Sequence, residues 1–176
     1  SLGTLNSFAE TLKLAMIFMM SRGFIALVLL ALIGLVACGG DSSSEEAADH
    51  YVEGTLLAAR GLWRDAINEF DESIRLDPNA ADAHVNRGIA YAEIGQFQKA
   101  LEDYDEAIRL DPVIPGAYYN RGLANGSLGN HAQSVVDYSD AIRLDPKSAD
   151  AYFNRGYSHS QLGQHQLAVE DFGNAA

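Results

Sequence analysis

The most informative chemistry in this sequence lies in an Asn-Arg pair that occurs three times at a spacing of 34 residues. A glycine follows each of the three pairs, which are Asn86-Arg87, Asn120-Arg121 and Asn154-Arg155. A side-chain amide both donates and accepts hydrogen bonds, so a row of asparagines can hold an extended peptide backbone without reading its sequence. The pairs therefore indicate a role in binding.

Other polar residues do not have the spacing of a catalytic or metal site. His50 and His84 stand where tyrosines occur in later parts of the chain, so we expect packing roles, and we expect His131 and His165 to be exposed in turns. The acidic run 102–111 lacks the glycine and the final glutamate of a calcium loop. The sequence contains no phosphate-binding glycine loop and no nucleophile elbow. We predict a protein that is not an enzyme and needs neither a cofactor nor a metal.

Charge and cysteine content narrow the partners further. The chain of 176 residues has 12 Lys and Arg against 24 Asp and Glu, which gives a net charge of -12. Nucleic-acid affinity begins with the neutralisation of phosphates, so this balance makes nucleic acid an unlikely ligand. The single cysteine, Cys38, excludes an intramolecular disulfide framework and most metal sites.

The N-terminal part of the sequence resembles a bacterial lipoprotein signal. An apolar run, Phe24–Ala37, follows Arg22, and Leu35-Val36-Ala37-Cys38 at its end is similar to a lipobox. The resemblance implies that residues 1–37 are removed, with Met20 as the expected start, and that Cys38 becomes a lipidated N-terminus. Residues 38–46 would form a flexible acidic tether, and Gly39 in place of Asp favours an outer membrane.

A transmembrane anchor is the alternative for this segment. Ile25–Ala37 is shorter than the roughly 20 residues that span a bilayer. A longer span would place Arg22 inside the membrane at a cost of about 2.5–3.5 kcal/mol. The lipoprotein hypothesis is favoured, and it places the chain in the bacterial cell envelope, anchored to a membrane and facing the periplasm or the exterior.

Residues 47–176 consist of a repeat of 34 residues, which resembles the tetratricopeptide repeat. "IRLDP" ends at Pro78, Pro112 and Pro146, and a glycine recurs at Gly54, Gly88, Gly122 and Gly156. An aromatic residue recurs 16 positions after each of these glycines. The repeats are 47–80, 81–114, 115–148 and 149–176, of which the last is incomplete. The resemblance implies an all-α fold, a right-handed α-solenoid of tandem helix-turn-helix repeats.

The same resemblance suggests where a ligand would bind. The first helix of each repeat lines the concave face in this family, and the asparagines fall on a side of that helix away from the packed stripe. They are similar to the asparagine ladder of the O-GlcNAc transferase family. We predict peptide-binding residues at Asn86, Asn120, Asn154, Tyr119, Phe153 and Tyr157. The alternative is that each asparagine bonds a neighbouring repeat and only sets the stacking.

The arginines have a different expected role. Each lies at the border of the packed stripe, so its aliphatic stem is expected between repeats while the guanidinium meets a nearby acid. Arg87, Arg121 and Arg155 are therefore predicted to be structural.

These observations favour a lipid-anchored extracytoplasmic adaptor whose concave groove binds a peptide segment or a partner protein. The alternative is a structural subunit of an envelope complex that docks, or self-associates, through the incomplete C-terminal repeat. An accessory domain of an enzyme encoded beyond Ala176 is a third possibility.

Overall fold

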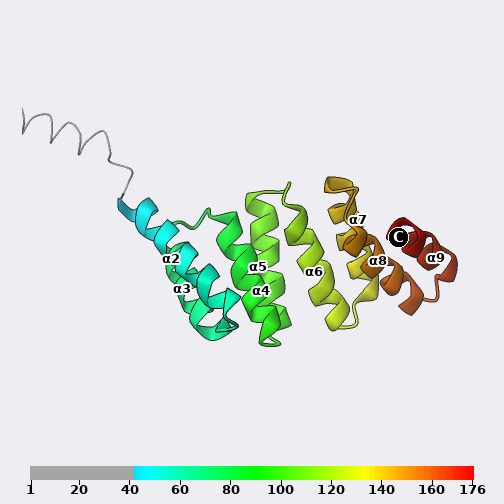
Figure 1. Cartoon of the computed structure of the whole chain (residues 1–176), viewed down its shortest axis with the longest axis horizontal. Helices are drawn as coiled ribbons and strands as arrows, with labels where there is room; N and C mark the ends of the chain where they lie inside the picture. The colour runs from blue at the N-terminus through cyan, green and yellow to red at the C-terminus, as the bar shows by residue number, and fades with distance from the viewer. Residues whose placement is uncertain (1–41) are drawn as a thin grey trace, which may run out of the picture. The chain divides into compact units, whose positions relative to one another are not determined.

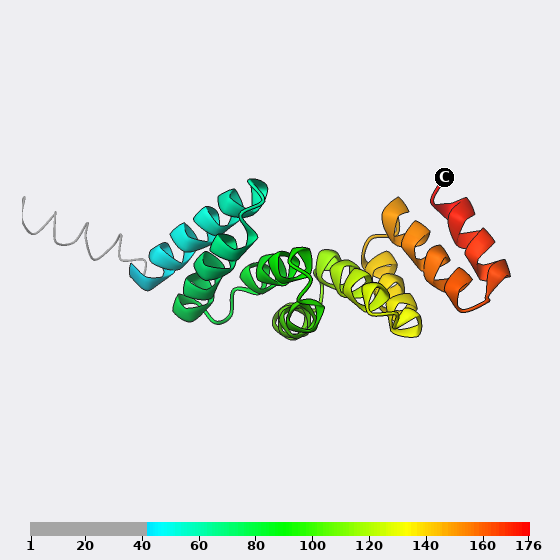
Figure 2. The ribbon, with the colours of Figure 1, turned by 90° about the horizontal axis from the view of Figure 1, so that it is seen from below.

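The computed structural model describes residues 42–176, which form eight α-helices and, within that range, no strand. Successive helices lie side by side in a stack (Figure 1). Figure 2 shows the same order of helix pairs from below. Helices α2, α4, α6 and α8 are called A helices, and α3, α5, α7 and α9 are called B helices. Their bounds are α2 Ser42–Ala59, α3 Trp63–Leu76, α4 Ala81–Glu93, α5 Phe97–Leu110, α6 Pro115–Ser127, α7 His131–Leu144, α8 Ala149–Gln161 and α9 His165–Asn174.

This arrangement confirms the predicted all-α solenoid of helical pairs. The predicted signal segment, residues 1–37, and Cys38 lie outside the described residues. None of the helices between residues 42 and 176 combines the length and the apolar character that crossing a bilayer requires.

Each A helix turns into its B helix through a glycine. Gly61, Gly95, Gly129 and Gly163 have φ angles of 75°, 76°, 78° and 73°. This left-handed region is open to glycine and unfavourable for residues with a Cβ. The sequence period of 34 residues therefore places a reversal of the chain at the same point of every pair.

The helices of a pair approach closely because a second glycine faces an aromatic ring. A Cβ added at Gly88 would lie 2.6 Å from the ring of Tyr104, and one at Gly122 would lie 2.7 Å from that of Tyr138. Both tyrosines are buried, as is Phe70, which faces Gly54 in the first pair. A side chain at these glycines would force the helices apart, so the recurring Gly-aromatic combination fixes the distance between the helices.

Helix α2 begins earlier than the predicted repeat boundary at residue 47. Residues 42–46, which the sequence assigns to the flexible tether, belong to this helix. Glu45 lies in its first turn, where a carboxylate interacts favourably with the helix dipole. Residues 42–46 are mostly exposed, whereas Ala47 directly after them is buried, so the helix extends beyond its packed part into a segment whose composition is polar.

Candidate functional site

The three predicted ladder asparagines lie on consecutive A helices at the same position of each repeat. Asn86 is on α4, Asn120 is on α6 and Asn154 is on α8, and all three side chains are half-buried. We call these three residues the asparagine ladder.

Two members of the asparagine ladder bond the preceding repeat. The Nδ2 of Asn86 donates to the hydroxyl of Tyr51 on α2 over 3.0 Å. In the same way, Nδ2 of Asn154 donates to the hydroxyl of Tyr119 on α6 over 3.0 Å, and it also donates to the carbonyl oxygen of Asp150. The amide of each asparagine therefore joins successive A helices, while its Oδ1 accepts no hydrogen bond from residues 42–176. Part of each amide is used for stacking, and an acceptor remains for a ligand.

Asn120 differs from its two equivalents. The residue one repeat earlier at the tyrosine position is Val85, which has no hydroxyl. The side chain of Asn120 accordingly has no hydrogen-bond partner within residues 42–176. It lines a cavity of about 310 Å³ together with Ile89, Phe97 and Leu123. Asn120 is thus the ladder member whose full hydrogen-bonding capacity is available.

The environment of Tyr119 also links two repeats. Burial raises the pKa of Tyr119 above its ordinary value, and the nearby carboxylate of Asp150 raises it further, while the hydrogen bond from Asn154 acts in the opposite direction. The Tyr119 ring packs against that of Tyr138, with centroids 5.8 Å apart. The hydroxyl therefore stays protonated and keeps a hydrogen to donate.

The remaining predicted aromatic residues lie on α8 and are open to solvent. Phe153 is 55% exposed and Tyr157 is 52% exposed, although Phe153 also packs against Phe172 and Tyr157 contacts the edge of His131. Aromatic side chains with this exposure are favoured anchors at protein interfaces. Together with the asparagine ladder, they give the A helices a surface with both amide and aromatic groups.

The arginines that follow the ladder asparagines are structural, as predicted. Arg121 donates from Nε and from a terminal nitrogen to Asp137 on α7, over 3.0 and 2.7 Å, and its other terminal nitrogen bonds Asp105 on α5 at 2.7 Å. Arg87 joins Asp103 and Asp71 in the same way, and Arg155 joins Asp171 and Ser139. Each arginine therefore clamps its own B helix to that of the preceding repeat.

One acid of each clamp, the aspartate on the B helix of the same repeat, is buried. Asp103, Asp137 and Asp171 are 4%, 0% and 4% exposed. Burial lowers the pKa of Arg121, but its hydrogen bonds to Asp137 and Asp105 and their charges outweigh this and raise it above the ordinary value. The position of the arginines predicts an acidic partner but does not identify it, whereas an aspartate that recurs 16 residues after each arginine is the sequence signal that does.

At the position of Tyr91 in the second repeat, the third and fourth repeats have the polar residues Asn125 and His159. Asn125 is buried and donates to the free oxygen of Asp137 over 2.9 Å. His159 is buried too, with Nδ1 2.6 Å from Oε1 of Gln164. Both side chains therefore contact the buried aspartate of an arginine clamp, Asn125 at Asp137 and His159 at Asp171.

The other histidines have mostly packing roles. The Nδ1 of His50 lies 2.7 Å from Glu69, and that of His84 lies 3.3 Å from buried Asp103. His165 is exposed, as predicted. His131 is not: it is the first residue of α7, it is half-buried, and its ring forms a T-shaped pair with that of Tyr157 on α8, with centroids 6.4 Å apart. The exposed-turn prediction for His131 is wrong because a neighbouring A helix packs over it.

Within residues 42–176, no three His, Cys, Asp or Glu side chains converge on a point where a metal ion could bind.

Comparison with protein families gives matches over most of the helical region. A family model described as "Tetratricopeptide repeat" matches residues 51–115 and 85–138. A second model, described as "TPR repeat", matches residues 126–163. Among curated proteins, no match is found.

Solved structures with the same arrangement of helices include a MamA crystal structure. It is 28% identical to this chain, with 80% of each chain covered and a TM-score of 0.71. The first TPR of Spaghetti (RPAP3), bound to the HSP90 peptide SRMEEVD, is 24% identical over 68% of this chain and 95% of its own, with a TM-score of 0.67. YrrB, described as a TPR protein with an unusual peptide-binding site, is 21% identical over 77% of this chain and 69% of its own, with a TM-score of 0.66.

Proposed function

The chain belongs to the tetratricopeptide repeat family, and from this premise we propose that it is an adaptor that binds a peptide segment or partner protein along its A helices. The observation that carries this proposal is the asparagine ladder. Its Oδ1 atoms accept no hydrogen bond from residues 42–176, and Asn120 has its whole amide available. Peptide-bound and peptide-binding proteins among the structures of similar fold support the proposal.

The chemistry of such binding follows from the amide group. An extended peptide presents one N–H and one C=O per residue, and a ladder amide can accept from the first and donate to the second. Binding through the backbone leaves the sequence of the peptide largely unread. Exposed aromatic residues beside the ladder, Phe153 and Tyr157, would add apolar contacts.

Asn120→Ala provides the sharpest test, because it removes a ladder amide without breaking a hydrogen bond of the described fold. The full chain in non-ionic detergent would be applied to an array of peptides that tile the envelope proteins of the source organism. We expect Asn120→Ala to weaken capture across the array at an unchanged melting temperature. Asn68→Ala on α3 is the matched control, since Asn68 is an exposed asparagine on a B helix. Equal capture by Asn120→Ala and the parent chain would refute the ladder as the binding surface.

We also propose that Cys38 is lipidated and anchors the adaptor to a bacterial membrane on its extracytoplasmic side. The support is the lipobox-like Leu35-Val36-Ala37-Cys38 at the end of an apolar run that contains the one cysteine of the chain. Cys38→Ser is expected to abolish incorporation of labelled palmitate and to release the protein from the membrane fraction. Labelling that persists in Cys38→Ser would contradict the lipid anchor.

A second candidate function is a structural subunit that docks through α9. The ring of Phe172 is 37% exposed and Val169 is 65% exposed, whereas the equivalent of Phe172 in the third repeat, Tyr138, is 2% exposed. An apolar face of this kind suits association with another protein surface. Under this hypothesis the chain self-associates, and Val169→Glu makes it monomeric in sedimentation experiments. A monomeric parent chain would favour the adaptor.

A further inference from the structure

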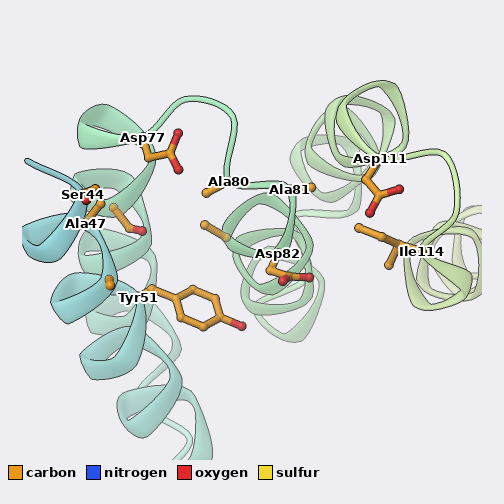
Figure 3. A pocket seen from close by; sticks show the side chains of 12 residues that line it. Ser44, Ala47, Tyr51, Asp77, Ala80, Ala81, Asp82, Asp111 and Ile114 are labelled. Carbon is orange, nitrogen blue, oxygen red and sulfur yellow. The ribbon is translucent and has the colours of Figure 1, made fainter. Parts of the chain in front are cut away.

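A cavity of about 270 Å³ lies between the first and second repeats, at the end of the A helices where the ladder begins (Figure 3). Tyr51, whose hydroxyl accepts the hydrogen bond from Asn86, forms one side of the cavity. Asp77 after α3, Asp82 on α4 and Asp111 after α5 also line it, and Figure 3 shows their side chains around the space. Tyr51 therefore links the cavity to Asn86, the first member of the ladder, and the three aspartates give the cavity negative charge.

The three carboxylates differ from the other acids between the repeats because none of them has a cationic partner within residues 42–176. The acids of the arginine clamps are each neutralised by a guanidinium at 2.6–2.7 Å. Asp77 and Asp111 instead accept one backbone N–H each, from Asn79 and Val113, over 3.0 Å. Each bond occupies one oxygen, so one oxygen of Asp77 and one of Asp111 are available to a ligand.

Ser73 provides an independent sign of a ligand. It is 1% exposed and lines the cavity, and its hydroxyl has no hydrogen-bond partner within residues 42–176. Buried hydroxyls are normally hydrogen-bonded, since an unpaired one costs free energy. The other repeats have alanine here, at Ala107, Ala141 and Ala175. The serine is therefore dispensable for the packing of a helix pair, and its hydroxyl is a polar group that the other repeats lack at this position.

The shape of the site indicates an elongated cation. The carboxylates do not converge on a point that suits a metal ion. The cavity is several times larger than the roughly 30 Å³ that a water molecule occupies. Ala47, Ala48 and Ile114 give part of its wall an apolar character, which suits the methylene stem of a lysine.

We propose that this cavity binds a lysine side chain of the peptide held along the asparagine ladder. The single free oxygens of Asp77 and Asp111 suit the point donors of an ammonium group better than the two-pronged guanidinium of arginine. Asp82 adds a third carboxylate, and the hydroxyl of Ser73 accepts a further hydrogen bond. This inference rests on the proposed function, and it adds the chemical class of the peptide: a basic one.

The junction between the third and fourth repeats has a related cavity of about 250 Å³. Tyr119, Asp145 and Asp150 line it in the positions of Tyr51, Asp77 and Asp82. The middle junction lacks two of the three groups, because Val85 replaces the tyrosine and Gly116 replaces the aspartate. The middle junction therefore keeps only Asp111 of the three groups and separates the two acidic cavities, which favours a peptide with two separated lysines.

The test uses nonapeptide mixtures labelled with fluorescein, in which the central residue is fixed and the flanking residues are randomised over uncharged types. The fixed residue is lysine, arginine, norleucine or glutamate, and binding to the full chain is measured by fluorescence anisotropy at low salt. We expect lysine mixtures to bind about tenfold more tightly than norleucine mixtures, since the gain is that of charge-assisted hydrogen bonds. Asp77→Asn/Asp82→Asn should reduce the ratio to below about threefold.

Asp49→Asn/Glu53→Gln is the matched control, because it removes the same charge from exposed residues of α2 that do not line the cavity. This control should keep the lysine preference, and melting temperatures verify that both variants are folded. Ser73→Ala, the residue of the other repeats, should weaken lysine binding alone.

Equal binding of lysine and norleucine mixtures, tighter binding of arginine than of lysine, or a preference that survives Asp77→Asn/Asp82→Asn would overturn the proposal. The adaptor function is tested separately in the same assay by Asn120→Ala. If Asn120→Ala weakens the binding of all mixtures while the parent chain binds lysine and norleucine mixtures equally, the adaptor function is supported and the lysine site is refuted. If no mixture binds, both are refuted.

Discussion

Arg121→Met removes the guanidinium that clamps α7 to α5 and keeps an unbranched apolar side chain at this position. It leaves Asp137, which is 0% exposed, as a buried carboxylate without its cationic partner. Removing one member of a buried ion pair typically costs about 3–5 kcal/mol. Two weaker bonds to Asp137 remain, from Asn125 at 2.9 Å and Gln133 at 3.4 Å, and they lower this cost.

The other half of the clamp contributes little. The side chain of Asp105 is 64% exposed, and ion pairs with such exposure contribute about 0–1 kcal/mol. We therefore expect Arg121→Met to lower the free energy of unfolding by about 2–4 kcal/mol. With a denaturant slope of about 2 kcal/mol per molar, the urea midpoint would fall by about 1–2 M.

Urea unfolding of the full chain, followed by the helical circular-dichroism signal, measures this change. Arg143→Met is the matched control, because Arg143 pairs with Asp140 on the same helix and its side chain is 61% exposed. The control should cost less than about 0.5 kcal/mol. Adding Asp137→Asn to Arg121→Met should recover much of the loss, since it removes the unpaired charge.

Two results would refute this reasoning. One is a cost of Arg121→Met that is no larger than that of Arg143→Met. The other is a double variant that is no more stable than Arg121→Met alone, because the loss would then not come from a buried charge.

Three further predictions concern packing, stacking and alkaline pH. Gly122→Ala should lower the free energy of unfolding by about 1–3 kcal/mol, because its Cβ would lie 2.7 Å from the buried Tyr138 ring. In the same urea experiment Gly116→Ala should raise the free energy of unfolding by about 0.5–1 kcal/mol, because its Cβ would meet nothing within 4 Å. Tyr119→Phe removes the acceptor of Asn154 and should lower the urea midpoint by the equivalent of about 0.5–1.5 kcal/mol, and no change would show that this bond does not stabilise the stack. Burial, with a smaller effect of nearby groups, raises the pKa of Tyr138 well above its ordinary value of 10.0, so the unfolded chain loses this proton first and stability should fall as the pH rises above about 10. Urea unfolding at increasing alkaline pH measures this fall, and the free energy of unfolding of Tyr138→Phe should fall less than that of the parent chain. An identical fall of the two proteins would contradict the assignment.

The asparagine ladder shows how far sequence reasoning reaches for a binding surface. The 34-residue spacing places Asn86, Asn120 and Asn154 at one position of successive A helices, and the structure has them there. The sequence left open whether they face a ligand or a neighbouring repeat. The structure shows a bond to the preceding repeat for Asn86 and Asn154 and none for Asn120, so the three residues are not equivalent.

The local features of this protein follow from the sequence by itself. Helical geometry fixes which side chains meet within one repeat. The features that depend only on such residues are the period, the helix pairs, the turn glycines and the close approach of Gly88 to Tyr104. The structural role of Arg121 also follows, because its position borders the packed stripe.

Only the tertiary structure decides which groups meet between repeats. The offset and rotation of one helix pair against the next result from all of their contacts together, and no local period encodes them. That geometry brings Asn154 to the hydroxyl of Tyr119, places the ring of Tyr157 against that of His131, and gathers three carboxylates without a cationic partner around one cavity with Ser73.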